Sequence, residues 1–249
     1  IGQGALQATT DGDQNVAVGN SALTAATTAG SNTAIGHDAL CANTTGGQNN
    51  AFGDGAMDAN TTGCRNVAMG NASMGKNTEG VCNVAIGYRA LICNVTGDKN
   101  TAVGASALSE NTTADNNTAL GFESLICNTT GTANLALGAY AMCLNTTAND
   151  NTAVGVAALL VNTTGAQNTA IGRSALTANT TGCRNIAIGY NSLAVNTTGC
   201  CNVSIGRTAL DANTEGDFNT AVGNSALSEN TTADNNTAVG YFAMNANTT

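Results

Sequence analysis

Hydrophobic and polar positions along this chain follow a pattern that repeats every 17 residues. Numbered from its asparagine, the unit reads N-[TV]-A-[VI]-G-x-x-A-L-x-x-N-T-T-G-x-x, and we call its positions slots one to seventeen; residues 168–184 are one copy, NTAIGRSALTANTTGCR. Slots two to four predict a short strand in which slots two and four share one face and slot three the other. The glycine at slot five predicts the end of that strand, because glycine permits a tight turn or the close approach of another backbone.

The rest of the unit holds a second pair of apolar positions, Ala/Ser at slot eight and Leu/Met at slot nine, and then Asn-Thr-Thr-Gly at slots twelve to fifteen. We interpret this part as a second strand edge that runs into a turn. Two short strands and two turns fit one coil of a parallel β-solenoid, a β-roll or β-helix, in which equal slots stack about 4.8 Å apart. A coil of one strand and one short helical turn around slots seven to ten is the second architecture that the pattern allows.

The unit recurs along the whole chain without insertion or deletion. This regularity predicts an all-β elongated rod of about 15 coils, roughly 70 Å long, formed as one continuous array over residues 1–249. The array lacks atypical end units, so we expect an uncapped segment of a longer fibre. Residues 43–66 reappear at 162–185, and 98–121 reappear at 217–240, an offset of 119 residues or seven coils. Such a duplication lengthens an array without creating a new site.

Asparagine at slot one and glycine at slot five form the expected structural ladder. Stacked asparagine side chains can hydrogen-bond along the axis and satisfy amides inside a turn. We expect slots two and four to face the coil interior and slot three to face away from it. The small residue at slot three then predicts close packing against its face, by either the opposite wall of the coil or another chain. The ladder begins with Asn15, Asn32, Asn49, Asn66, Asn83 and Asn100, and with Gly19, Gly36, Gly53, Gly70, Gly87 and Gly104.

Composition narrows the function classes. The net charge is −9 with no cluster of basic residues, which disfavours nucleic-acid binding. No apolar run is long enough for a membrane span. A single histidine and the absence of a nucleophile elbow or phosphate loop argue against an enzyme.

Metal binding is also disfavoured. The cysteines have no zinc-site spacing. Asp98 stacks on Asp115, and Asp217 on Asp234, but no calcium-binding motif surrounds them. We therefore expect solvated turn carboxylates without Ca²⁺, and no cofactor apart from N-linked glycans.

Those glycans are suggested by slot twelve, where eleven units carry Asn-x-Ser/Thr. In a secreted eukaryotic protein this motif is a glycan acceptor, and it requires that slot twelve points outward. The alternative is a second asparagine ladder. The candidates are Asn43, Asn60, Asn94, Asn111, Asn128, Asn145, Asn162, Asn179, Asn196, Asn230 and Asn247.

Several of the nine cysteines fall on adjacent coils, and the coil spacing lies within the Cα separation that a disulfide accepts. We predict rungs from Cys64 to Cys82, from Cys127 to Cys143, and from Cys183 to either Cys200 or Cys201. The alternative is a set of small buried thiols. Disulfide rungs would place the protein in an oxidising, extracellular compartment.

Aromatic residues gather at the turn after the strand. Tyr88, Phe122, Tyr190 and Tyr241 occupy slot six, and Tyr140 and Phe242 occupy slot seven. Exposed rings can stack on sugars or dock a neighbouring fibre. They are also compatible with ordinary turn-capping.

The strings NTAIGHDAL, NVAIGYRAL and NTAVGNSAL resemble the head repeats of trimeric autotransporter adhesins and the related repeats of phage tail fibres. The resemblance covers the full length. It implies a parallel β-roll, generally assembled as three chains side by side, that projects from a cell or virion and contacts surfaces. The 17-residue unit departs from the adhesin head by its greater length and by NTTG between the strands.

Together these features predict a non-enzymatic, extracellular structural fibre segment at a cell or virion surface, serving as a shaft or adhesive spacer. Its partners would be copies of itself, in a parallel trimer or an end-to-end filament. The alternative is a surface-binding module for a host receptor or carbohydrate. Ice binding is a weaker form of that alternative, because it requires a flat face with two parallel threonine rows.

Overall fold

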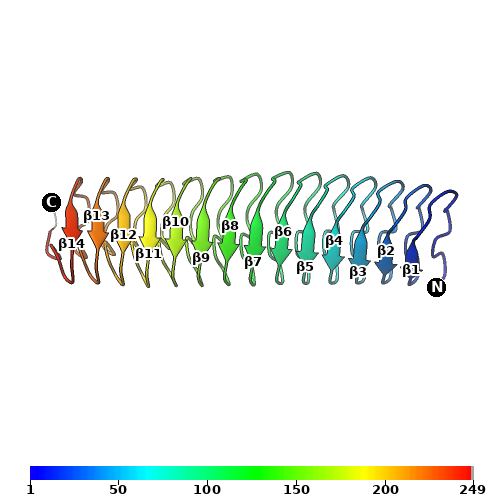
Figure 1. Cartoon of the computed structure of the whole chain (residues 1–249), viewed down its shortest axis with the longest axis horizontal. Coiled ribbons are helices and arrows are strands. Elements are labelled where there is room, and N and C mark those ends of the chain that lie inside the picture. Colours follow the sequence, from blue (N-terminus) through cyan, green and yellow to red (C-terminus); the bar gives the residue numbers. More distant parts are fainter. Residues whose placement is uncertain (248–249) are drawn as a thin grey trace. The chain divides into compact units, whose positions relative to one another are not determined.

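The computed structural model describes residues 1–247 of the 249. The chain divides into two compact units, Ile1–Glu123 and Ser124–Thr249, the second of which includes the two residues that are not described. Each unit is an all-β parallel β-solenoid, and each coil is one 17-residue repeat (Figure 1). This division does not test whether residues 1–249 form one continuous array, so the single array stays a prediction.

Every coil contributes one strand of three residues, at slots two to four. The first unit contains β1 (Val16–Val18), β2 (Thr33–Ile35), β3 (Asn50–Phe52), β4 (Val67–Met69), β5 (Val84–Ile86), β6 (Thr101–Val103) and β7 (Thr118–Leu120). The second contains β8 (Leu135–Leu137), β9 (Thr152–Val154), β10 (Thr169–Ile171), β11 (Ile186–Ile188), β12 (Val203–Ile205), β13 (Thr220–Val222) and β14 (Thr237–Val239).

Strand register follows the repeat. In the first unit Val16 lies opposite Thr33 and Ala17 opposite Ala34, so that equal slots of adjacent coils pair in parallel. The same pairing joins Ile171 to Ile188 in the second unit. Residues 1–247 hold fourteen strands, one fewer than the predicted number of coils, because Ile1 already occupies slot four.

The prediction of two strands per coil is wrong. Slots seven, nine and seventeen adopt the left-handed backbone region, as in Ala157 (φ 55°), Leu159 (φ 52°) and Gln167 (φ 61°). The N–H of Ala157 donates to the preceding coil, at Ala139, while the N–H of Leu159 donates to the following coil, at Ala175. This segment therefore bonds to both neighbours without extended geometry. The one-turn helix is not observed either, since residues 1–247 contain no helix.

The strand also faces the other way from the first expectation. Slot three points into the coil and is buried, while slots two and four point outward. The one serine at slot three, Ser204, identifies what it faces: its hydroxyl donates to the carbonyl of Ala209 and lies 2.7 Å from the Ser192 hydroxyl, and both partners occupy slot eight. The small residue at slot three is thus explained by the opposite wall of the coil.

The apolar interior consists of columns of small and aliphatic side chains. Alanine at slot three meets Ala/Ser at slot eight, and Leu or Met at slot nine fills the remaining space. Each fully buried Leu or Met contributes roughly 1.5–3 kcal/mol relative to an exposed one. The fully buried large residues are Leu23, Leu40, Met57, Met74, Leu91, Leu108, Leu125, Met142, Leu159, Leu176, Leu193 and Leu210.

Candidate functional site: asparagine rows and outer columns

The asparagine row at slot one joins side chain to backbone. The Asn32 carbonyl oxygen Oδ1 accepts the backbone N–H of Asn49 at 2.8 Å, and the Asn49 Oδ1 accepts that of Asn66 at 3.0 Å. The amide nitrogen crosses the coil instead, since the Asn49 Nδ2 donates to the carbonyl of Gly63 at 2.8 Å. The slot-one side chains thus hydrogen-bond along the axis, mainly from side-chain oxygen to backbone N–H. Amide-to-amide bonds join some of them as well, as from Asn202 to Asn185 at 3.2 Å.

An amide-to-amide ladder does exist, at slot twelve. The Asn60 Nδ2 donates to the Oδ1 of Asn43 at 2.8 Å, and the Asn77 Nδ2 donates to the Oδ1 of Asn60 at 2.8 Å. The second hydrogen of the Asn60 amide reaches Gly63 of its own coil at 3.0 Å. Both N–H groups and the carbonyl oxygen of the buried Asn60 amide therefore have hydrogen-bond partners, as a buried amide requires.

The two rows meet at the slot-fifteen carbonyl. Gly63 accepts one hydrogen bond from Asn49 and one from Asn60, which uses both lone pairs of its oxygen. Gly182 accepts in the same way from Asn168 and Asn179. Around slot fifteen, asparagine side chains therefore supply hydrogen bonds to the backbone carbonyl that a second β-strand would otherwise supply.

These contacts contradict glycosylation at slot twelve. The asparagines from Asn43 to Asn230 have no exposed surface, and a glycan on Nδ2 would replace a donor that the ladder uses. The candidate acceptors buried in this way are Asn43, Asn60, Asn94, Asn111, Asn128, Asn145, Asn162, Asn179, Asn196 and Asn230. Asn247 is half-buried and donates to Asn230 at 3.1 Å. The sequence motif at slot twelve is thus explained by the ladder.

Glycine at slot five is fixed by the backbone of the next coil. Gly70 has φ +137°, and a Cβ built on it would lie 2.5 Å from the carbonyl oxygen of Gly87. Real Cβ atoms do not approach so closely. Close contact between coils, together with a backbone conformation that favours glycine, accounts for glycine at slot five.

The stacked aspartates at slot sixteen have a structural role. The Asp115 Oδ1 accepts the backbone N–H of Asp98 at 2.7 Å, and the Asp98 Oδ1 accepts that of Val81 at 2.8 Å. In the second unit, Asp234 accepts from Asp217 in the same way at 2.7 Å. Each carboxylate caps the turn of the coil before it. Within residues 1–247 no three metal-ligating side chains form a cluster.

The predicted cysteine rungs differ in what the structure brings together. The Cys82 N–H donates to the Cys64 carbonyl at 3.1 Å, and the Cys127 N–H donates to that of Cys143 at 3.1 Å. These contacts place each pair on adjacent coils through the backbone. The two rungs stay predictions, and Cys64 and Cys82 are thiols in the structure.

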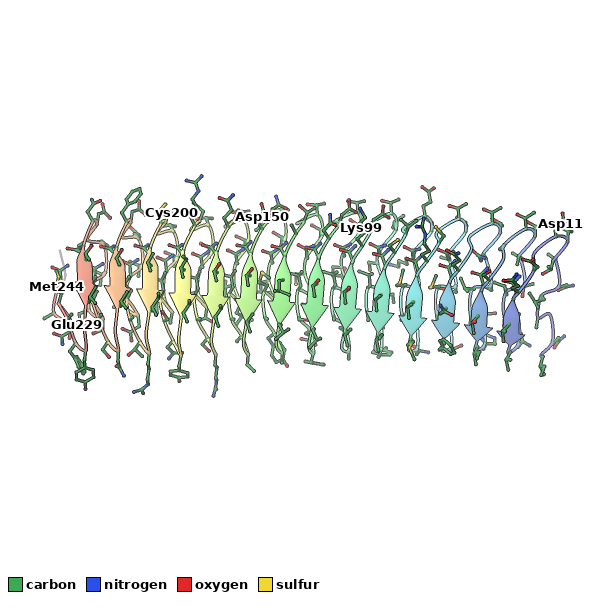
Figure 2. All side chains as sticks on the ribbon, viewed as in Figure 1. Asp11, Lys99, Asp150, Cys200, Glu229 and Met244 are labelled. Atoms are coloured by element: carbon green, nitrogen blue, oxygen red, sulfur yellow. The ribbon has the colours of Figure 1, made fainter. Side chains whose placement is uncertain are left out.

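Cys183 and Cys200 approach through their sulfur atoms. The two Sγ atoms lie 3.0 Å apart, and the Cys183 N–H donates to the Cys200 Sγ at 3.0 Å. The Cys200 N–H in turn donates to Asp217 at 2.6 Å. Cys200 lies at the same edge of the second unit as Asp150 (Figure 2). Of the two partners that the sequence left open for Cys183, Cys200 is the one whose sulfur is within reach.

We expect glutathione disulfide to oxidise this pair slowly at neutral pH and faster at alkaline pH. Burial raises the pKa of the Cys200 thiol, and Cys183 and Asp217 raise it further, so little attacking thiolate exists at neutral pH. The reaction forms the Cys183–Cys200 bond and releases two glutathione thiols. Peptide mass mapping against pH measures it. A rate that stays flat as the pH rises, or the same cross-linked peptide in Cys183→Ser, would contradict the assignment.

The outer face of each sheet carries two columns without charge. Slot four holds only Val, Ile, Leu, Met or Phe, and slot two holds Thr, Val, Ile, Leu or one Asn. Ile35 and Ile171 are each 38% exposed, and Met69 is 42% exposed. Each unit therefore presents a regular, largely apolar strip along the sheet.

The aromatic residues are exposed, as the sequence predicts. Tyr88, Phe122, Tyr190, Tyr241, Tyr140 and Phe242 all lie at the surface of their coils. The two threonine slots are not equivalent. Slot thirteen is half-buried, and its hydroxyl donates to the next coil, as from Thr163 to Thr180 at 3.0 Å, whereas Thr164 at slot fourteen is exposed.

The fold and these rows define the class of protein, a parallel β-solenoid built from tandem repeats. Comparison of the chain with models of protein families, with curated proteins and with solved structures finds no match. Among residues 1–247, no helix has the length and apolar character needed to cross a membrane.

Proposed function

We propose that this chain is a non-enzymatic structural segment of an extracellular fibre or filament, acting as a shaft or adhesive spacer at a cell or virion surface. The observation that carries the proposal is the repetition of one set of coil-to-coil contacts throughout each unit. Asn60 donates to Asn43 in the first unit as Asn179 donates to Asn162 in the second, each at 2.8 Å. A repeat whose interior is used entirely for stacking adds length and stiffness with every coil.

Self-association is the second part of the proposal. The strip at slots two and four supports it, because an uncharged apolar surface with a constant step can pack on an equal strip of another copy, in a parallel trimer, while the coil ends can stack into a filament. The resemblance to adhesin heads and tail fibres agrees with the side-by-side trimer.

Light scattering and negative-stain electron microscopy test this part. We expect oligomers or filaments of constant width. Lysine at two strip positions, in Ile171→Lys/Ile205→Lys, should shift the mass toward the monomer by placing charge in the contact. The control Thr164→Lys/Thr198→Lys adds the same charge at exposed slot fourteen and should leave assembly unchanged. A wild-type chain that stays monomeric at every concentration would exclude self-association.

A surface-binding module is the second candidate, and the exposed rings at slot six favour it. Tyr88 and Tyr190 are 55% and 44% exposed, and aromatic rings supply large contact areas at low entropic cost. Its ice-binding form is less well supported, because the slot-thirteen hydroxyls already donate to the backbone. Thermal hysteresis in solutions of the chain would reverse that ranking.

A further inference from the structure

Slot six of the second unit brings two arginines and a tyrosine onto consecutive coils. Arg173 follows β10, Tyr190 follows β11 and Arg207 follows β12, each one residue after the slot-five glycine. All three side chains are exposed. The Arg207 Cζ lies 6.0 Å from the centroid of the Tyr190 ring, a cation–π contact that holds one guanidinium beside the ring. We call these three residues the arginine–tyrosine ridge.

The ridge is cationic although the chain is acidic. The net charge is −9, but slots four to seven contain no carboxylate from the coil of β9 to that of β14. Within residues 1–247 no ion pair or side-chain hydrogen bond engages the guanidinium of Arg173 or Arg207. Their planar donor forks are therefore open to an anionic group from outside. The segments without a carboxylate are 154–157, 171–174, 188–191, 205–208, 222–225 and 239–242.

The spacing of the two arginines selects among anionic polymers. They lie two coils apart, about 10 Å along the axis. Same-side residues of an extended peptide are about 6.7 Å apart, which does not match this step. Two arginines on a chain of net charge −9 are too few to neutralise the closely spaced phosphates of a nucleic acid. A lipid surface calls for about four or more basic residues together. A pyranose ring is about as long as one coil step, so a polysaccharide with an acid group on every second sugar does match.

We propose that the arginine–tyrosine ridge binds an acidic polysaccharide that carries one carboxylate on every second sugar and lies along the coil axis. Arg173 and Arg207 each receive one carboxylate, and the Tyr190 ring and hydroxyl contact the uncharged sugar between them. This inference rests on the surface-binding form of the proposed function and names its ligand class.

The test uses the whole chain and a hyaluronan hexasaccharide, in which every second sugar carries a carboxylate. Calorimetric titration at low salt should detect binding that weakens as salt rises, because exposed charges are screened. Arg173→Gln and Arg207→Gln should each weaken binding roughly tenfold, the effect of losing one charge-assisted contact. Tyr190→Ala should also weaken it, and the fold tolerates alanine at slot six, where Ala105 and Ala139 stand.

The matched control is Arg184→Gln, which removes the same charge from an exposed arginine at slot seventeen of the same unit. It should leave the affinity unchanged. Equal weakening by this control, equal binding of an uncharged N-acetylglucosamine hexamer, or no binding of hyaluronan at low salt would each overturn the inference. Light scattering of the same variants separates the two proposals. If the chain assembles but does not bind hyaluronan, only the ligand assignment is wrong. If a strictly monomeric chain binds hyaluronan, only the self-associating fibre is wrong.

Discussion

Replacing Gly70 with alanine should cost more than about 3 kcal/mol and open the coils on either side of it. The backbone there has φ +137°, a region that side chains other than glycine rarely adopt, and the new Cβ would meet the Gly87 carbonyl oxygen at 2.5 Å. The backbone cannot move away easily, because the Gly70 N–H donates to Phe52 of the preceding coil at 2.8 Å. Denaturant unfolding followed by amide hydrogen exchange, peptide by peptide, measures both the loss and its location.

The chain itself offers the control. A Cβ built on Gly63, at slot fifteen, would lie 2.4 Å from the Asn60 Oδ1 and 2.6 Å from the Gly80 carbonyl oxygen, but Gly63 does not have the positive φ of Gly70. Alanine stands at this slot as Ala29, Ala114, Ala148 and Ala233. Gly63→Ala should therefore cost less than about 1 kcal/mol, within the range of ordinary glycine-to-alanine changes. If the two variants lose equal stability, the positive φ at slot five is not what requires glycine there.

The second large effect is expected from Asn179→Asp, a change of one atom inside the slot-twelve ladder. The Asn179 Nδ2 donates to Asn162 at 2.8 Å and to Gly182 at 2.9 Å, and its Oδ1 accepts from Asn196 at 2.9 Å. A carboxylate keeps the acceptor but turns two donors into an oxygen that faces two other oxygens. Because the position has no exposed surface, we expect a loss of about 3 kcal/mol or more at neutral pH.

That loss should shrink on acidification. Burial and the two facing oxygens raise the folded-state pKa of the new carboxyl above its unfolded value near 4. A group with a raised pKa favours folding below its unfolded pKa, and this contribution disappears as the pH rises through the folded pKa. The difference from wild type should therefore be smallest in acid. Unfolding midpoints against pH measure it, with Thr181→Glu as the control, since Glu79 and Glu215 occupy that exposed slot elsewhere. A pH-independent deficit would mean that the carboxyl stays solvated.

The sequence predicts the 17-residue period, the strand at slots two to four and the stacking of equal slots. These features follow from residue types that recur at fixed slots, namely the β-branched residues of the strand, the glycine at slot five and the asparagine at slot one. The sequence does not predict the conformation of the long return segment. Leucine at slot nine has φ near 52°, as in Leu40 and Leu159, although a bulky residue ordinarily avoids this region. Hydrogen bonds to both neighbouring coils impose it, and no propensity of a single residue reports such bonds.

The sequence does not predict the inward direction of the strand either. Val and Ile at slots two and four favour an apolar inner face, yet alanine at slot three fills the narrow space opposite slot eight. Slot twelve was ambiguous in the same way, since Asn-Thr-Thr suits both a glycan acceptor and a buried ladder. A signal was present in Asn77 and Asn213, which keep the asparagine where the acceptor motif is lost.

The slot-twelve row also gives each unit a net dipole along the coil axis. From Asn60 to Asn94, and again from Asn145 to Asn230, every amide points its N–H toward the preceding coil and its carbonyl toward the following one. Aligned amide dipoles add along the axis, as they do in an α-helix, so the amino-terminal end of the row is positive and the carboxy-terminal end negative. Rows stacked end to end attract one another head to tail and repel head to head. A filament of such units would therefore be polar, with two distinguishable ends and all its units in the same orientation.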